Sequence, residues 1–215
     1  SRRNGVQRVT PDVLAAMEEM NLVAPAHNPP YIRAMRLLGE KLPEIPLVAA
    51  FETGFHNTIA DKLRVYAAPY EWAEKLHIKR WGFHGASHKF IAERSAELLD
   101  RDDIAERVRQ LYVAGTSTPI RQPEIRVISC HMGGSSSITG IRDGLALGSS
   151  MGLSPQSGLP QNNRVGELDS FALPFLMRSA NLSLDEAERL MCKESGLKAL
   201  SGGYNDIRDI ESQAA

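Results

Sequence analysis

Residues 126–166 contain the combination of residue types in this chain that is best suited to hold an anion. Residues 126–131 have the two-residue period of a β-strand, a glycine–serine loop follows, and a second strand is predicted at residues 138–141. A small-residue loop inside a hairpin can turn several backbone N–H groups toward one anion. No Gly-Lys-Ser/Thr follows the glycines, so a hairpin loop and not a Walker A loop would hold a polyphosphate. A flexible surface turn is the other interpretation.

Two charged side chains stand where a ligand could meet them. Arg164 ends the uncharged stretch 144–163, and its guanidinium stays ionised and offers paired donors to a phosphoryl group. Glu52 follows the apolar run 47–51, which reads as a central strand, and ligands bind beyond the carboxyl ends of strands in open α/β sheets. A carboxylate there could orient or deprotonate a ligand. A surface salt bridge for Arg164 and a helix cap or exposed rim charge for Glu52 are the alternatives.

The histidines allow a metal-site interpretation as well as a structural one. His84 and His88 are four residues apart, a spacing that can place two zinc ligands on one helix face. Gly85 indicates that His84 precedes the helix, and no cysteine or carboxylate completes a known zinc motif. His27 and His131 lie beside turn residues, where hydrogen-bonded structural histidines are common.

Alternating strand and helix signals predict an α/β protein that positions these side chains. Thr10 and a following proline begin a helix, and Ser183 with Glu186 forms a capping box for another. The charged and turn-rich stretch 101–122 reads as a surface excursion. Further strands are predicted at 47–51 and 78–83, with further helices at 31–38, 71–76 and 87–99 and a final helix beginning near residue 206.

Composition excludes several classes of protein. At 215 residues with 42% hydrophobic and 24% charged residues, the chain resembles an ordinary soluble globular protein. A net charge of −1 gives no general attraction to nucleic acid or to an anionic membrane, so neither is expected as a partner. Two cysteines indicate a reducing compartment, and neither a signal peptide nor a membrane span is visible. We expect a cytoplasmic protein.

Seven motifs, taken in order, resemble the acetate kinase family, which includes kinases of acetate, propionate and related short carboxylates. The resemblance extends from about residue 9 to the end, and GFHG-SH is its most specific part. The motifs are AHNP (26–29), FETGFH (51–56), YAAPY (66–70), WGFHGASH (81–88), CHMGG (130–134), SMGLSP (150–155) and NDIRD (205–209).

The resemblance implies the acetate- and sugar-kinase/actin-like (ribonuclease H-like) fold, a mixed sheet flanked by helices, with one of two α/β domains incomplete. Residues 1–53 would be a remnant of the N-terminal domain. Residues 54–215 would form the second domain, with the nucleotide-phosphate loop and the catalytic histidine and arginine. The implied reaction is reversible phosphoryl transfer between ATP and acetate or a similar short carboxylate, with Mg²⁺, in a homodimer.

The family's functional positions fall on named residues of this sequence. Glu52 stands at the position of the catalytic aspartate, and His84 and Arg164 stand at those of the transition-state stabilisers. His27 and His88 would be secondary active-site residues. ATP and ADP would be bound by a phosphate loop of His131, Met132, Gly133, Gly134 and Ser135 and by an adenosine segment of Asp206, Ile207 and Arg208. The acids of this last segment have a simpler explanation, because acidic residues in a first helical turn complement the helix dipole.

Departures from the family pattern surround the phosphoryl site. The extra methylene of Glu52 moves a carboxylate by about an ångström, which can cost on the order of 100-fold in rate. Gly148 stands where the family has aspartate, residues 161–163 replace Met-Gly-Thr, and residues 132–135 differ from Leu-Gly-Asn-Gly. These changes leave two alternatives open: a kinase with another donor, such as pyrophosphate, or another acceptor, and a nucleotide-binding relative that has lost catalysis.

By comparison with the family, the chain also lacks an N-terminal phosphate loop, a substrate-binding arginine upstream, and a C-terminal glutamate near the metal. We therefore expect no metal site within this chain, Mg²⁺ ligands outside it, and no activity from the isolated fragment.

Overall fold

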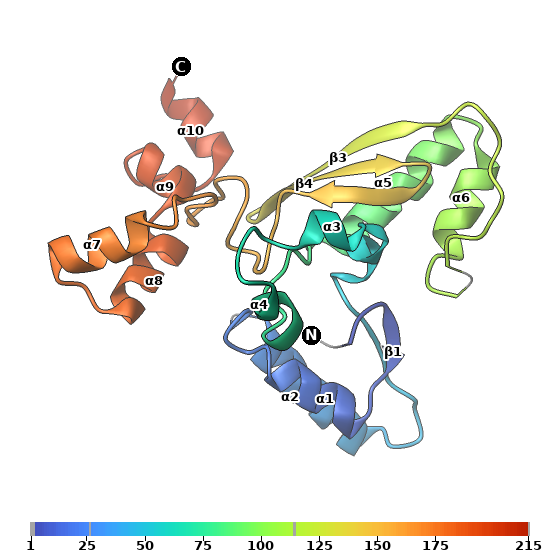
Figure 1. Cartoon of the computed structure of the whole chain (residues 1–215), viewed down its shortest axis with the longest axis horizontal. Helices are drawn as coiled ribbons and strands as arrows, with labels where there is room; N and C mark the ends of the chain where they lie inside the picture. Colours follow the sequence, from blue (N-terminus) through green and yellow to red (C-terminus); the bar gives the residue numbers. More distant parts are fainter. Residues whose placement is uncertain (1–2, 26, 114, 215) are drawn as a thin grey trace.

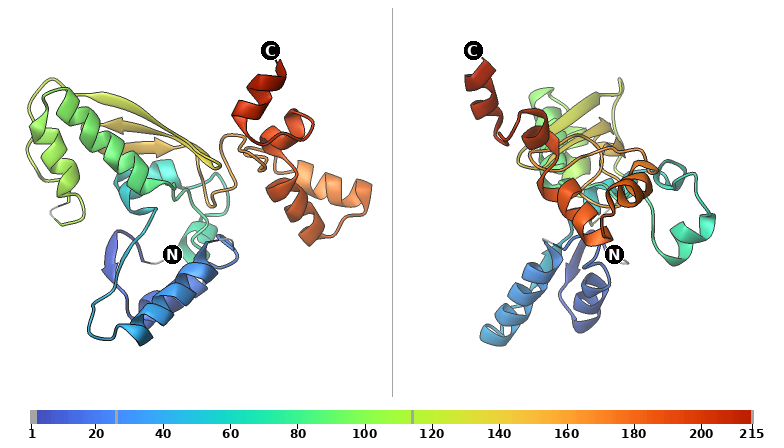
Figure 2. Two further views of the ribbon diagram at one scale, coloured as in Figure 1. Left: turned by 180° about the vertical axis from the view of Figure 1, so that it is seen from behind. Right: turned by 90° about the vertical axis from the view of Figure 1, so that its left-hand side faces the viewer.

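The computed structural model describes residues 3–25, 27–113 and 115–214, so Ala26 of the first motif lies outside the described residues. The elements form three groups in chain order (Figures 1 and 2). A central group is built on a three-stranded sheet, the N-terminal helices lie beneath it in the view of Figure 1, and the C-terminal helices extend from one end of the sheet. The boundary expected at residue 53 stays a prediction.

The central sheet confirms the predicted hairpin and extends it. β3 (Arg126–Met132) pairs antiparallel with β4 (Ser136–Arg142), and β4 pairs antiparallel with β5 (Leu145–Ser149). Asp143 and Gly144 both have positive φ, at 50° and 80°, as a two-residue hairpin turn requires. β5 was not predicted, because its sequence LALGS is short and rich in small residues.

Two helices cover one face of this sheet (Figures 1 and 2). α5 (Gly85–Leu98) confirms the predicted helix and packs on α6 (Asp102–Arg109). The expectation of a surface excursion at 101–122 is wrong at α6, because Ile104, Ala105 and Val108 form a fully buried stripe beneath its charged outer face. The remaining helices of the central group are a 3-10 helix (Gly54–Thr58), α3 (Asp61–Arg64) and α4 (Tyr70–Lys75).

The N-terminal group begins with β1 (Val6–Arg8), which pairs antiparallel with β2 (Val48–Ala50). A strand near residues 47–51 is therefore confirmed, but its central position is wrong, because the strand is three residues long and Val48 is 61% exposed. Thr10 caps α1 (Pro11–Glu18) by accepting a hydrogen bond from Val13 N–H, as predicted. This helix packs on α2 (Asn28–Lys41), which begins earlier than expected and runs through Gly39.

The strand expected at residues 78–83 is also wrong. Positive φ values at His77 and Gly82 interrupt the extended backbone. Lys79 pairs with Val65 in an isolated β-bridge and not as part of a strand. Gly82 instead lies against the ring of His56, where a Cβ atom would come within 2.5 Å of the imidazole. The segment therefore forms a close-packed turn that delivers the chain to α5.

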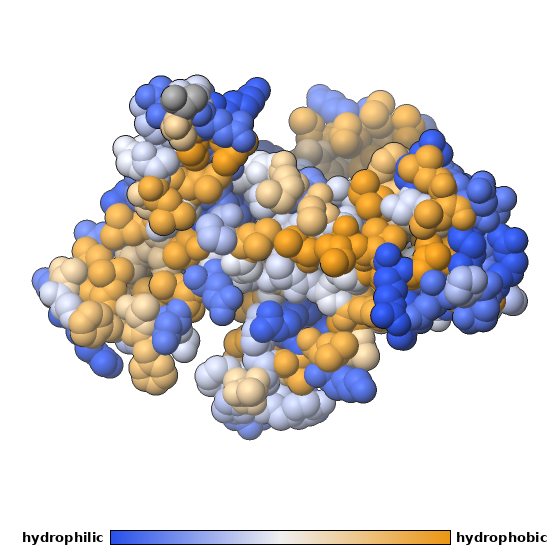
Figure 3. Space-filling view, turned by 90° about the horizontal axis from the view of Figure 1, so that it is seen from above, coloured by the Kyte–Doolittle hydropathy of each residue, from blue (hydrophilic) through white to orange (hydrophobic). Residues whose placement is uncertain are grey.

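The C-terminal group consists of helices. Ser183 and Glu186 make both hydrogen bonds of the predicted capping box at the start of α8. No helix in the described ranges is long and apolar enough to cross a membrane. Figure 3 shows apolar surface in separate areas over the C-terminal helices and the central group, interrupted by hydrophilic side chains. The helices are α7 (Ala172–Ala180), α8 (Leu184–Lys193), α9 (Gly196–Leu200) and α10 (Ile207–Ala214).

Replacing Gly144 with alanine should lower the free energy of unfolding by about 2–4 kcal/mol, since the residue needs positive φ and the added carbon would lie 2.5 Å from Val108 Cγ2. Chemical denaturation would measure the loss. The matched control is Gly140→Ala, in the same sheet, where nothing lies within 4 Å of an added Cβ. Equal losses in the two variants would contradict the packing described.

Candidate active site

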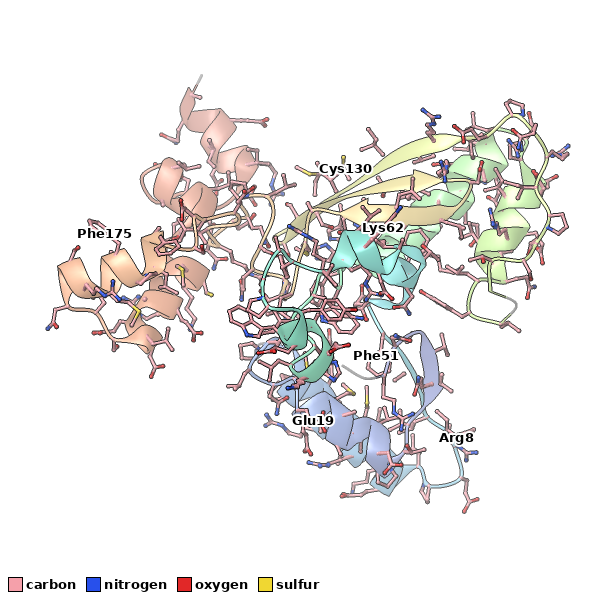
Figure 4. The ribbon with its side chains drawn as sticks, viewed as in Figure 1. Arg8, Glu19, Phe51, Lys62, Cys130 and Phe175 are labelled. Atoms are coloured by element: carbon pink, nitrogen blue, oxygen red, sulfur yellow. The ribbon has the colours of Figure 1, made fainter. Side chains whose placement is uncertain are left out.

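A cavity of about 660 Å³ brings together six of the residues singled out from the sequence. Methionine and aromatic side chains form its apolar wall, including Phe51, which lies at the junction of the N-terminal and central groups (Figure 4). Glu52 is the one carboxylate and Arg164 the one permanent cation among the described lining residues. The six predicted residues on its wall are His27, Glu52, His84, His131, Ser135 and Arg164.

The backbone at Gly85 ties two of these residues together. Gly85 N–H donates to the Glu52 carbonyl oxygen over 2.9 Å, and a Cβ at Gly85 would lie 2.2 Å from that oxygen. His84 adopts a left-handed conformation, with φ 58° and ψ 32°, as the residue preceding α5. The expectation that His84 lies before the helix is confirmed. The end of the Glu52 segment and the turn of His84 are thus one packed unit.

Buried hydroxyl groups hold the histidines of the central group. His84 Nδ1 lies 2.8 Å from Ser137 Oγ, and His88 lies 2.8 Å from Ser129 Oγ through Nδ1 and 2.7 Å from Ser137 Oγ through Nε2. The His84 ring stacks on His131, with centroids 4.0 Å apart and planes 19° from parallel. These contacts fix the orientation of the His84 ring on the cavity wall.

The zinc interpretation of the two histidines is wrong for this geometry. Both ring nitrogens of His88 are within hydrogen-bonding distance of serine hydroxyls, so neither is free to bind a metal ion. Residues 3–25, 27–113 and 115–214 contain no group of three or more His, Cys, Asp or Glu side chains that could hold one. His88 is buried and does not line the cavity, and it contacts the cavity wall indirectly, through Ser137 and His84.

Burial keeps these imidazoles neutral. It lowers the pKa of His56 to about 3 and the pKa values of His84 and His88 to about 4, and the charge of a neighbouring histidine is the next cause in each case. The pKa of His27 is also lowered, first by burial and then by Arg164, while Glu52 opposes the shift. These four histidines therefore offer polar but uncharged groups near neutral pH.

Gln161 holds Arg164, and its role was missed by sequence reasoning. Arg164 Nη1 donates to Ser135 Oγ, Gln161 Oε1 and the Pro155 carbonyl over 3.2–3.3 Å. Gln161 is 1% exposed, accepts a 2.6 Å hydrogen bond from Ser135 Oγ and donates to Pro155 O. The available signal was the departure of residues 161–163 from the family pattern.

The predicted phosphate loop contributes only in part to this cavity. Gly133 N–H donates to Ser135 O over 3.2 Å, which leaves the N–H groups of Gly134 and Ser135 to meet an anion. Met132 is 74% exposed, and Met132, Gly133 and Gly134 do not line the cavity. The phosphate-binding and surface-turn interpretations both stay open.

The predicted adenosine segment lies elsewhere. Asp206, Ile207 and Arg208 stand at the start of α10, at the far end of the C-terminal group (Figure 1), and do not line the cavity. Asp206 accepts hydrogen bonds from the backbone and side chain of Arg208, so these two residues are paired with each other. Their contact with a nucleotide stays a prediction.

The chain resembles solved kinase structures throughout its length. A propionate kinase from Francisella tularensis subsp. tularensis SCHU S4 matches with a TM-score of 0.83 and 31% identity over 98% of this chain and 49% of that one. Porphyromonas gingivalis acetate kinase matches with a TM-score of 0.79 and 32% identity, covering 98% and 48%. The fold is therefore that of the acetate and propionate kinases.

Sequence comparison leads to the same family. An acetate kinase from Halothermothrix orenii is 39% identical over 203 residues, covering 94% of this chain and 46% of its own length. The profile of the Acetokinase family matches residues 5–215, and the chain belongs to that family. The resemblance and the fold predicted from the motifs are confirmed. The chain spans about half the length of the curated relatives it matches.

Lowering the pH should destabilise the protein between about 6.5 and 4. An unfolded chain takes up protons on these histidines near their ordinary pKa of 6.5, whereas His84 and His88 in the folded chain resist protonation until about pH 4. The contribution of these histidines to the free energy of unfolding is therefore fully present above pH 6.5 and is lost as the pH falls toward 4. Thermal unfolding at pH 7.5 and pH 5 should show a lower midpoint at pH 5. The decrease in midpoint between pH 7.5 and pH 5 should be smaller in His56→Asn, because this variant lacks one histidine whose pKa is lowered by burial. Identical midpoints at both pH values would contradict the lowered pKa values of the buried histidines.

Gln161→Leu should destabilise the protein by about 2–3 kcal/mol, because it removes the buried amide that pairs with Ser135, Arg164 and Pro155 without changing the side-chain volume much. Urea denaturation is the measurement. Asn163→Ala is the control, since Asn163 accepts a hydrogen bond from Ser195 through its backbone carbonyl, which the substitution retains. A loss in Gln161→Leu no larger than in the control would rule out this support of Arg164.

Proposed function

We propose that the protein containing this chain transfers phosphoryl reversibly between ATP and acetate or a similar short carboxylate, giving an acyl phosphate. One observation carries the proposal: Glu52, His84 and Arg164, which stand at the catalytic positions of the family pattern, line one cavity. In phosphoryl transfer a protein mainly positions the reactants and neutralises charge on the moving group. The polar wall of this cavity is suited to that task.

Arg164 is the proposed electrostatic stabiliser. Its hydrogen bonds to the described residues all use Nη1, so Nε and Nη2 are left to donate to phosphoryl oxygens. The partners of Nη1 are a hydroxyl, an amide and a carbonyl, none of which neutralises the guanidinium. A fixed, uncompensated cation is what a transition state with negative charge on its equatorial oxygens requires.

His84 and Glu52 would complete the polar wall. His84 is held by Ser137 and by the stacked ring of His131, so it can direct a ring nitrogen toward the phosphoryl group without reorganisation. Glu52 is exposed at the cavity wall and would orient the acceptor or the moving group. The apolar wall at Phe51 and Phe83 suits the alkyl part of a short carboxylate.

Nucleotide and metal binding make different demands on these residues. Gly134 and Ser135 could donate backbone N–H groups to the phosphates of ATP or ADP, and Asp206 to Arg208 stay the proposed adenosine contact. Mg²⁺ prefers several oxygen ligands, and the described lining residues include only one carboxylate, that of Glu52. These residues therefore do not form a magnesium site by themselves. Cytoplasmic residence and a homodimer remain part of the proposal.

The direct test is an acyl-hydroxamate assay with ATP, Mg²⁺ and a panel of short carboxylates on the natural protein that contains this chain. Arg164→Ala should lower kcat by about 10²–10³-fold, because a preorganised donor to the transition state is lost. Arg189→Ala is the control, since Arg189 makes an exposed ion pair with Glu194 on the C-terminal helices. Absence of turnover with every acceptor, with ATP and with pyrophosphate as donors, would remove the kinase proposal.

A second candidate is a nucleotide-binding relative without catalysis, and the observation that favours it is the glutamate at position 52. Glu52→Asp separates the two functions. A large gain in kcat would indicate a carboxylate displaced by one methylene in an active kinase. ATP binding without turnover in both the natural protein and the variant would support the binding protein.

A further inference from the structure

Four side chains form a continuous hydrogen-bonded chain that ends at the cavity. It runs from Ser129 on β3 to His88 on α5, then to Ser137 on β4 and finally to His84, with successive distances of 2.8, 2.7 and 2.8 Å. Ser129 is 1% exposed, and His88 and Ser137 are fully buried. We call these four residues the Ser–His relay. Because no other described residue makes a hydrogen bond to these four side chains, the donor and acceptor roles within the relay can be counted.

The count has one solution that satisfies every buried donor. Ser129 Oγ has no described hydrogen-bond partner other than His88 Nδ1, so its O–H must donate to that nitrogen or remain unpaired. His88 is then protonated on Nε2 and donates to Ser137 Oγ. The Ser137 hydroxyl must in turn donate to His84 Nδ1. His84 is left with its proton on Nε2.

Each of the other arrangements leaves one buried hydroxyl proton without an acceptor. If His88 carried its proton on Nδ1, it would donate to Ser129, whose own O–H would have no acceptor among the described residues. If both His84 and His88 donated to Ser137, the Ser137 O–H would have none. An unsatisfied buried donor is costly, so both arrangements are disfavoured.

We propose that Ser129, His88 and Ser137 are positioning residues that fix His84 in the Nε2–H tautomer, so that a neutral N–H donor faces the cavity. The part of this inference that concerns phosphoryl transfer rests on the proposed function. His84 Nε2 makes no hydrogen bond with a described residue, and its ring lines the cavity. The relay reaches this nitrogen from a serine that touches neither His84 nor the cavity.

The charge state of His84 agrees with this arrangement. A second proton on Nδ1 would face the Ser137 hydroxyl that already donates to it, so a cationic His84 would have to break the relay. The pKa of His84 is lowered to about 4, first by burial and then by the surrounding His131, His88, Arg164 and His27. The group therefore acts as a neutral donor and not as a second cation beside Arg164.

A nearby histidine provides an internal comparison. His56 Nε2 lies 3.1 Å from Thr139 Oγ1, and both residues are fully buried on the same side of the sheet as His88. His56 and Thr139 share no hydrogen bond with the relay. Removing the Thr139 hydroxyl thus disturbs a neighbouring buried pair without removing any hydrogen bond of the relay.

The test is ¹⁵N NMR of the natural protein labelled at the histidine rings, which distinguishes a protonated ring nitrogen from an unprotonated one. His84 and His88 should both be protonated on Nε2. Ser129→Ala should give His84 a mixture of tautomers although the two residues do not touch, Ser129→Thr should restore the Nε2–H form, and Thr139→Val should leave His84 unchanged. A protonated His84 Nδ1 in the natural protein, or a His84 signal unaffected by Ser129→Ala, would overturn the relay.

Kinetics then separate the relay from the proposed function. In an active natural protein, Ser129→Ala should lower kcat about tenfold with little change in KM for the carboxylate, and Ser129→Thr should recover it. An unchanged kcat would overturn the catalytic part of the inference. If the predicted NMR pattern is found in a protein without kinase activity, the relay is supported and the kinase function is rejected. If kinase activity is found with the proton on Nδ1 of His84, the kinase function is supported and the relay is rejected.

Discussion

The close approach of the Gly85 backbone to the Glu52 carbonyl is the contact on which the site depends. It joins a segment from the N-terminal group to the turn that carries His84, and a side chain at Gly85 would be incompatible with it. His131 stacks on His84, and Arg164 lines the same cavity. The site is therefore defined first by backbone packing and only then by side-chain chemistry.

In this site the charged side chains and the neutral polar side chains are different residues. Its charged groups are one cation and one carboxylate, while His27 and His84 are uncharged because burial makes their protonation costly. An isolated cation in such surroundings interacts more strongly with an anionic ligand than it would in water. The neutral His27 and His84 do not compete with Arg164 for a negatively charged ligand, so the positive charge of Arg164 can act on the ligand directly.

Local sequence signals predicted the hairpin and the helix caps, whereas the common site of His27, Glu52, His84, His131, Ser135 and Arg164 was implied by the family resemblance. They failed where tertiary packing decides. The charges of α6 concealed a buried stripe, and positive φ at His77 and Gly82 replaced the strand predicted at residues 78–83 with a packed turn. Gln161 could not be found from its type, because its importance lies in contacts with residues 135, 155 and 164. The Ser–His relay likewise depends on a register between β3, β4 and α5 that no single segment encodes.

The attachment of residues 161–164 to the C-terminal helices has a mechanical consequence. Their carbonyl groups accept hydrogen bonds from Ser195, Leu197 and Lys198 around the start of α9, and Gly196 packs so closely that a Cβ would lie 2.0 Å from Gln161 O. The guanidinium of Arg164 is meanwhile anchored to Ser135 beside the sheet. Arg164 thus links the C-terminal helices to the central sheet. If the C-terminal helices rotated relative to the sheet, Arg164 would either move with them and lose its hydrogen bond to Ser135, or its segment would lose its contacts with α9.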